Sequence, residues 1–222
     1  MQYAVIAIYF GILLMIGWVA SRRVDSLSDF YVGGKRLGFW VAAFSSRASG
    51  ESAWLYLGLT GLGAFAGLQA LWVVIGEVLG VGAAWFLMAA PFKRATDRYG
   101  SITIPDYFVS RFCGETPASA TARWLRLLAA FALSVFVTIY VSAQIDATGT
   151  AFETFLGWDY FAGGMFGFLI VVVYTTSGGF LAVAWSDLFQ GLLMLVGLVA
   201  LPVAAWLALP AGVDVRSEMA AV

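Results

Sequence analysis

The sequence contains no histidine and a single cysteine, Cys113, among its 222 residues. Histidine is the commonest general base and metal ligand in proteins, so the usual catalytic triads and zinc sites cannot be built. One cysteine excludes a disulfide within the chain and a metal site made of cysteines. We therefore expect a protein that is not an enzyme and that carries no cofactor.

Charged residues are also scarce, at 11% of the chain, whereas hydrophobic residues make up 62%. Soluble domains carry about 25% charged residues. Several apolar segments exceed the roughly 18 residues that indicate a transmembrane helix. The composition therefore predicts an all-α, multi-pass protein of the cell membrane, and the net charge of −1 gives no indication of nucleic-acid binding.

The apolar segments predict about six transmembrane helices. Helix one covers residues 3–20, and we expect it to be retained rather than cleaved as a signal peptide. The other five are expected at residues 38–65, 70–90, 127–147, 161–174 and 188–209, with a tight connection, TTSGGFLAVAWSD, before the last. In the polar stretch before residue 127, the segment ITIPDYFVSRF predicts a short surface helix, because Pro105 suits a first helical turn.

Basic residues mark alternate loops of this predicted topology. Ten of the 12 Lys and Arg residues lie in the loops that follow the first and third helices. Cytoplasmic loops of membrane proteins carry an excess of Lys and Arg. The pattern predicts that both loops face the cytoplasm and that the N-terminus lies outside the cell.

The second apolar segment has a polar cluster at its centre. Residues 45–52 contain four serines together with Arg47, Gly50 and Glu51. A charge at membrane depth costs on the order of 3 kcal/mol, so a simple anchor would not carry this cluster. We expect a break in the helix at residues 48–52, as in the transporters that hold ions and substrates at broken helices. The alternative is a kinked packing helix with an internal Arg47–Glu51 ion pair.

Three further acidic residues lie within or beside apolar segments. Glu77 could form an ion pair with Arg47 or act in function. Asp146 lies near the outer end of its predicted helix, which favours a structural role. Asp187 either caps a helix N-terminus or lies on an ion path. The roles of Arg47, Glu77 and Asp146 stay open at this point.

Four segments occur in a distinctive order: SDFYVGGKRLGFWVAAFSSRASGESAWLYLGLTG, ITIPDYFVSRF, VTIYVSAQ and YTTSGGFLAVAWSDLFQGLLM. Together they resemble the sodium:solute symporter family, most closely its sodium/proline symporter branch. The family has the leucine-transporter-type fold, in which two inverted five-helix repeats follow one extra N-terminal helix. The resemblance implies that residues 1–222 are the N-terminal portion of such a symporter. Helix one is then the extra helix, residues 38–209 form the first repeat, and the C-terminal repeat is absent.

The resemblance also implies a function, which is sodium-coupled symport of a small organic solute, such as proline or another amino acid, by alternating access. In the family, backbone carbonyls at the break of the first repeat helix help to hold the sodium ion. These positions fall on Ala48 and Glu51. Asp187 matches an acid that is linked to the inward exit of sodium, and no metal other than sodium is expected.

The substrate contacts implied by the resemblance lie close to the same break. Ser49, Gly50 and Ser52 line it, and Tyr140 matches a tyrosine that lies near the substrate in sodium/proline members. The expected partners are therefore the solute, the sodium ion, the lipid bilayer and the missing C-terminal repeat. Members often carry an acid where this chain has Gly50, and here the acid comes one residue later, at Glu51.

Two other interpretations remain at the level of the sequence. One is a membrane sensory module of a symporter-like signalling protein, which an appended histidine-kinase domain would support. The other is an inactive, truncated transporter fragment. A second five-helix repeat in the same reading frame would instead support transport.

The predicted orientation can be tested by cysteine labelling. Cysteines placed at Ser28 and Ala118 should react only with a membrane-permeant reagent, because both lie in the basic loops. A cysteine placed at Gly157 should react from outside the cell. Labelling of the Ala118 position by an impermeant reagent would reverse the orientation.

Overall fold

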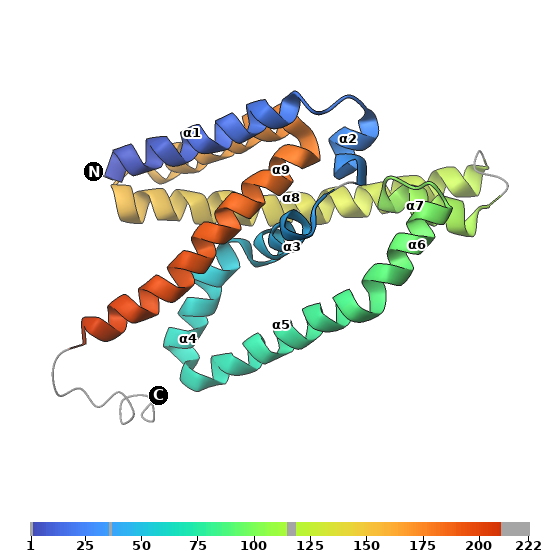
Figure 1. Ribbon diagram of the computed structural model, residues 1–222. Coiled ribbons are helices and arrows are strands. Elements are labelled where there is room, and N and C mark those ends of the chain that lie inside the picture. The colour runs from blue at the N-terminus through green and yellow to red at the C-terminus, as the bar shows by residue number, and fades with distance from the viewer. Residues whose placement is uncertain (1, 36, 115–118, 210–222) are drawn as a thin grey trace. The chain divides into compact units, whose positions relative to one another are not determined.

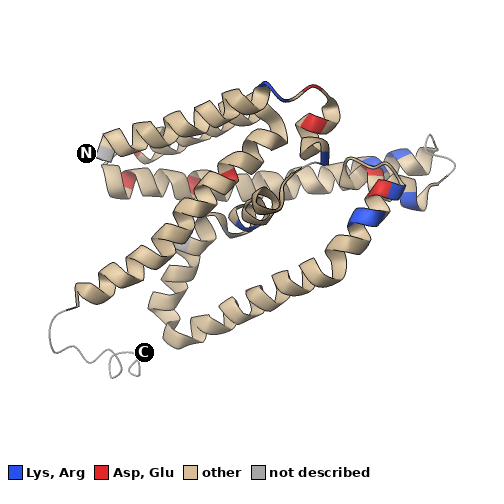
Figure 2. Cartoon of the chain, in the orientation of Figure 1, with Lys and Arg blue, Asp and Glu red and all other residues tan. Residues whose placement is uncertain are grey.

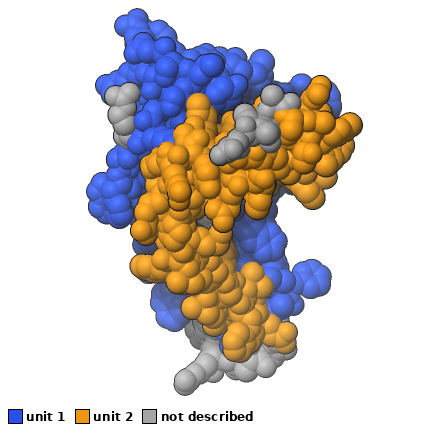
Figure 3. All heavy atoms as spheres, turned by 90° about the vertical axis from the view of Figure 1, so that its right-hand side faces the viewer, with its two compact units in different colours: residues 1–68, 145–222 blue, residues 69–144 orange. Residues whose placement is uncertain are grey.

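The computed structural model describes residues 2–35, 37–114 and 119–209, which form helices joined by short turns (Figure 1). The chain divides into two compact units (Figure 3). One unit consists of Met1–Leu68 and Ile145–Val222, and the other of Gln69–Gln144. No β-strand occurs in the part of the chain that the structure describes. The all-α fold class predicted from the sequence is therefore confirmed.

In the first unit, helix α1 (Gln2–Ser21) packs against helix α9 (Tyr160–Leu207). Both helices are apolar around their whole circumference, as expected of helices that lie within a membrane or a large core. Their contact forms the buried core of the unit, in which Leu13 of α1 meets Ile170 and Tyr174 of α9. The core therefore depends on side-chain packing between the two ends of the sequence.

The first half of α9 runs in the same direction as α1. Gly17 lies against Tyr174, and Ala20 lies against Gly178. A Cβ atom added at Gly17 would come within 2.6 Å of the Tyr174 Cβ, so the two backbones approach closely only because residue 17 is glycine. The end of α1 is consequently level with Gly178 of α9.

Helix α9 bends at Gly179, whose φ of +55° and ψ of −150° are not helical (Figure 1). Beyond the bend, the second half of α9 returns along α1, where Phe189 stacks on Tyr9. The predicted loop at residues 175–187 is therefore wrong, because helix continues up to and directly after one glycine. A single residue can redirect the chain here because glycine adopts positive φ without a steric penalty.

A short helix, α2 (Leu27–Val32), covers this bend. Ser26 caps it by accepting a hydrogen bond from the backbone N–H of Asp29 at 3.1 Å, and Gly33 ends it in a left-handed conformation. A Cβ atom on Gly179 would lie 2.6 Å from the carbonyl oxygen of Phe30. Helix α2 therefore packs directly against the backbone of the bend and leaves no room for a side chain at residue 179.

The second predicted helix consists of α3 (Phe39–Ala53), a π-helical segment η2 (Trp54–Leu59) and α4 (Thr60–Ala66). Helix α3 packs against α9. The sequence predicts a break within residues 48–52, and the structure places it at the last of these, because Ser52 has φ of 46° and ψ of −145°. The other residues of that stretch keep helical torsion angles.

The turn η3 (Gly67–Ala70) leads into the helices of the second unit, which are α5 (Leu71–Ala83), the π-helical η4 (Ala84–Ala89), α6 (Ala90–Arg98), α7 (Ile104–Phe112) and the larger part of α8 (Ala120–Leu156). The third predicted helix therefore extends through α6, beyond its predicted end at residue 90. The predicted surface helix is confirmed as α7, with Pro105 in its first turn and Thr103 as its N-cap. In Figure 2, basic residues gather at α6, at α7 and at the start of α8.

Among the described residues, four helical stretches are long and apolar enough to cross a membrane: Tyr3–Ser21, Leu57–Arg98, Ala120–Leu156 and Tyr160–Leu207. The second and fourth contain 42 and 48 residues. At 1.5 Å per residue, each is roughly twice as long as the hydrocarbon core of a bilayer is thick. Large apolar side chains such as Phe131, which is 70% exposed, suit contact with lipid. The chain is thus a multi-pass membrane protein, and six crossings stay a prediction.

We expect Gly179→Ala to destabilise the protein. Alanine would have to adopt a conformation that is nearly restricted to glycine, at a cost of about 1–3 kcal/mol, and its Cβ would press on the Phe30 carbonyl. The measurement is the thermal unfolding midpoint of the purified protein in detergent. Gly11→Ala is the matched control, because nothing lies within 4 Å of a Cβ atom at that position in α1. Equal midpoints for the two variants would contradict the assigned role of the bend.

Candidate functional site

A buried carboxylate, Asp187, lies where the second half of α9 meets α3. Its Oδ2 atom accepts hydrogen bonds from the Ser45 hydroxyl at 2.6 Å and from the Ser49 hydroxyl at 3.2 Å. The exposed fraction is 9% for Asp187 and 8% for Ser45. A buried carboxylate needs such donors, because an unpaired charge in an apolar surrounding is strongly disfavoured. These contacts fix α3 against α9.

The position of Asp187 within its helix tests one of the two roles considered from the sequence, the capping of a helix N-terminus. It lies inside the helical second half of α9, beyond the bend at Gly179. The capping interpretation is therefore wrong, since no helix begins at this residue. The intervening helix is about 12 Å long at 1.5 Å per residue, so the carboxylate lies well inside the apolar span.

The hydroxyl groups come from one side of α3. Ser45, Ala48, Ser49 and Ser52 recur at intervals of three and four residues, which places them along one face of a helix. Ala48 is buried, and the Ser52 hydroxyl donates a hydrogen bond to the Ser49 carbonyl oxygen at 3.2 Å. Hydroxyl, carbonyl and carboxylate oxygens are the ligands that hard cations prefer. The face thus offers a short row of suitable atoms beside the bend of α3.

The bend itself is held in a strained conformation. The torsion angles of Ser52, 46° and −145°, are close to those of Gly179, 55° and −150°. This region of the backbone map is favourable for glycine and costs other residues about 1–3 kcal/mol. Surrounding contacts must therefore hold Ser52 in place. Strained residues of this kind cluster at ligand sites.

The other predicted site residues are distributed around this bend. Ala48 belongs to the buried face of α3, whereas Gly50 is exposed and has open space where a Cβ atom would lie. Glu51 belongs to α3, and its side chain lies outside the part that the structure describes. Tyr140 belongs to α8 in the second unit. The structure brings Ser49 to Asp187, and the individual binding roles stay predictions.

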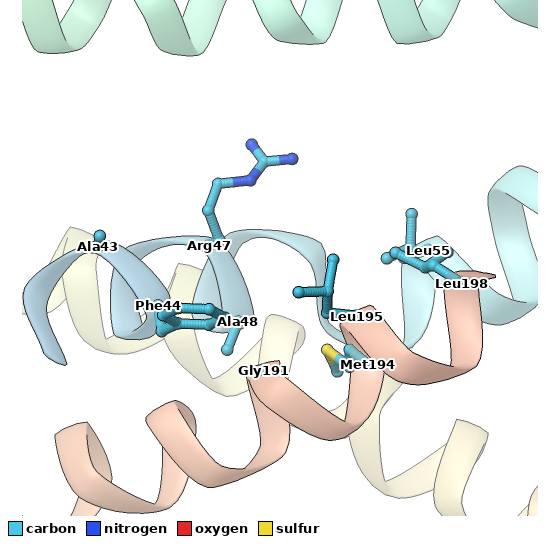
Figure 4. A pocket seen from close by; sticks show the side chains of 9 residues that line it. All are labelled: Ala43, Phe44, Arg47, Ala48, Leu55, Gly191, Met194, Leu195 and Leu198. Atoms are coloured by element: carbon cyan, nitrogen blue, oxygen red, sulfur yellow. The ribbon is translucent and has the colours of Figure 1, made fainter. Parts of the chain in front are cut away.

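Ala48 also lines an apolar cavity of about 330 Å³ (Figure 4). Phe44, Arg47 and Leu55 line it from α3 and η2, and Gly191 and Met194 line it from α9. In Figure 4 the guanidinium group of Arg47 points away from Gly191 and Met194. The cavity contributes no carboxylate or hydroxyl group, so it does not extend the row of oxygen atoms.

The structure places the three residues whose roles were left open. Arg47 lies on α3 in the first unit and Glu77 on α5 in the second, so an ion pair between them stays a prediction. Asp146 accepts a hydrogen bond from the hydroxyl of Tyr160. This contact connects the end of α8 to the start of α9, which supports the structural role favoured from the sequence.

Ser45 is a site residue that the sequence did not single out. Its hydroxyl makes the shorter of the two hydrogen bonds to Asp187. Its spacing of four residues from Ser49, inside an apolar segment, was a usable signal, because residues at i and i+4 share a helix face. The partner on α9 could not be read from this spacing.

The chain has clear relatives among known proteins. The model of the sodium:solute symporter family matches residues 30–222. The high-affinity proline transporter PutP of Bacillus subtilis (strain 168) is 39% identical over 192 residues, which are 86% of this chain and 39% of that protein. Sodium/proline symporter 2 of Staphylococcus saprophyticus is 34% identical over 220 residues, 98% of this chain and 42% of that protein. No solved structure matches the chain significantly.

The helical spans define the class as a multi-pass membrane protein, and the relatives named above are transporters. The match over most of the sequence is more specific: the chain belongs to the sodium:solute symporter family, as its sequence motifs predict. It spans about two-fifths of the length of the curated relatives that it matches.

We expect Ser45→Ala to destabilise the packing of α3 on α9. The variant removes the donor of a short hydrogen bond to a buried carboxylate, which costs about 1–3 kcal/mol. The measurement is again the thermal unfolding midpoint in detergent. Ser46→Ala is the matched control, because that neighbouring serine is exposed. If both variants unfold at the same temperature, the hydrogen bond does not contribute to stability.

Proposed function

We propose that these residues form the N-terminal half of a sodium-coupled symporter for a small organic solute, with proline as the first candidate. The family supports coupling to sodium, and the names of the relatives, proline transporter and sodium/proline symporter, support the substrate. The observation that carries the proposal is the buried Asp187 carboxylate beside the hydroxyls of Ser45 and Ser49 and the bend at Ser52.

In this proposal the chain has the first repeat of a leucine-transporter-type fold behind one extra helix, α1. The six crossings are α1, the α3–α4 segment, the α5–α6 segment, α8 and the two halves of α9. The lengths of the two longest apolar stretches support this division, and so do the non-helical glycines inside them, Gly67 and Gly179. The N-terminus lies outside the cell, in line with the basic loops.

The sodium ion is held at the bend of α3. The backbone carbonyls of Ala48 and Glu51 are its ligands in this chain, and a C-terminal repeat supplies the remaining ones. Asp187 serves the ion on its way to the cytoplasm, because a carboxylate inside a transmembrane segment attracts a cation that is leaving the bend. The membrane potential favours this direction by about 2.3 kcal/mol per charge and 100 mV.

The solute lies next to the ion, in contact with Ser49, Gly50, Ser52 and Tyr140. The open space beside Gly50 and the exposed side of Ser49 leave room for a small molecule there. Sodium binding stabilises the outward-open conformation that accepts the solute. The repeats then rock about the bend, which gives alternating access.

The proposal predicts that Asp187→Asn in the full-length protein raises the sodium concentration for half-maximal proline uptake by about tenfold, the effect of losing one favourable charge interaction. Asparagine keeps the acceptor for the serine hydroxyls, so folding should be preserved. The measurement is uptake of labelled proline into cells that lack their own proline transporters, at a series of sodium concentrations.

Asp146→Asn is the matched control, because it removes the same charge at a position bonded to Tyr160. Its sodium dependence should equal that of the unaltered protein. An unchanged sodium dependence in Asp187→Asn would exclude this residue from the ion path. Proline uptake without any stimulation by sodium would overturn the coupling itself.

A further inference from the structure

A second, polar cavity lies at the opposite end of the first unit's core from the chain's N-terminus. It has a volume of about 450 Å³ and is lined by the segment after α1, by α2 and by the start of the second half of α9. Pockets that bind small molecules have volumes of roughly 300–1,000 Å³. The proposed transport function uses none of its residues.

The cavity lies at the boundary between the membrane and water. The apolar span of α1 ends at Ser21, and the bend of α9 at Gly179 is level with that end. Trp18 and Trp185 lie at the same end, in contact with the arginines of the cavity. Tryptophan and arginine side chains at the end of a transmembrane span are typical of the lipid headgroup region.

Two arginines give the cavity a cationic side. The guanidinium carbon of Arg22 lies 3.9 Å from the ring centre of Trp18, and that of Arg23 lies 5.0 Å from the ring centre of Trp185. Stacking on a ring holds a guanidinium group in place and leaves its in-plane N–H donors available. In the described part of the chain, neither arginine forms an ion pair.

Two carboxylates, Asp25 and Asp29, line the same cavity. Figure 2 shows basic and acidic residues together between the end of α1 and α2. The carboxylates would repel a purely anionic ligand, and the arginines would repel a purely cationic ligand. The charge pattern therefore fits a small zwitterion that contains a phosphate, which arginine binds in bidentate fashion, and an ammonium group.

We propose that this cavity binds the headgroup of phosphatidylethanolamine, with its phosphate on Arg22 and Arg23 and its ammonium group on Asp25. The Asp29 carboxylate lines the same cavity and accepts a hydrogen bond from the Ser26 hydroxyl at 2.6 Å. A lipid, rather than a dissolved zwitterion, is favoured because the cavity adjoins the apolar span and includes Leu37 and Leu181 in its wall. The bound lipid contacts the segment after α1, helix α2 and the start of the second half of α9. It thereby stabilises the helical segment directly after the bend, in which Trp185 precedes Asp187 by two residues.

The test measures lipid retention by the full-length protein with native mass spectrometry. Delipidated protein is supplied with dioleoyl phosphatidylethanolamine or dioleoyl phosphatidylglycerol at equal concentrations. The unaltered protein should retain phosphatidylethanolamine about tenfold more strongly, the effect of one well-placed charge-assisted contact. Equal retention of the two lipids would overturn the proposal, and this result needs no variant.

Variants test whether the preference for phosphatidylethanolamine comes from this cavity. Arg22→Gln combined with Arg23→Gln should abolish it, whereas Arg94→Gln combined with Arg98→Gln, which removes the same charge from α6, should leave it unchanged. Asp25→Asn should shift the preference toward phosphatidylglycerol, because it removes a repulsive carboxylate. Retained preference in the Arg22 and Arg23 variant would place the lipid elsewhere and overturn the assignment.

A further experiment with dissolved phosphoethanolamine distinguishes binding of a lipid from binding of a free solute with the same headgroup. It should raise the thermal unfolding midpoint of delipidated protein much less than the lipid does. If phosphoethanolamine stabilises the protein as well as phosphatidylethanolamine does, the site binds a free solute and the assignment to lipid is wrong. None of these measurements depends on transport, so their failure is distinct from a failure of the proposed function.

Discussion

The requirement to satisfy one buried carboxylate organises the first unit. Asp187 lies inside an apolar helix, where an unpaired charge is strongly disfavoured, and it accepts hydrogen bonds from Ser45 and Ser49. These bonds set both the side of α3 that faces α9 and the position of α3 along it. The bend at Ser52 is fixed as a consequence, because it lies on the same helix face, two turns beyond Ser45.

Two bends with nearly the same torsion angles have different physical consequences. Gly179 adopts its conformation without cost, so the reversal of α9 is a stable part of the scaffold. Ser52 adopts almost the same conformation with a side chain, so its bend depends on the contacts around it. A bend of that kind is suited to a site where ligands bind and leave, since a change in its contacts changes its stability. The bend of the scaffold thus has a glycine, Gly179, where the bend at the proposed site has a serine, Ser52.

The bend at Gly179 also connects the two polar regions of the unit. Residues just before and after it pack on α1 and α2, and Trp185 borders the polar cavity while Asp187 binds the serines of α3. Less than one helical turn separates these two side chains. The proposed lipid site and the proposed ion path therefore share one short segment of α9.

The sequence alone determined the helical class, the membrane location, the family and the short helix α7, because hydrophobic runs, capping residues and motifs are local signals. It also located the polar cluster of α3, since serine, arginine and glutamate are rare at the centre of an apolar membrane segment. It could not decide that residues 175–187 are helical on both sides of Gly179, because polar, glycine-rich segments also form loops. Nor could it pair Ser45 with Asp187, which lies 142 residues away in the sequence. Only tertiary packing decided these points, since the energy of a buried charge depends on which distant side chains surround it.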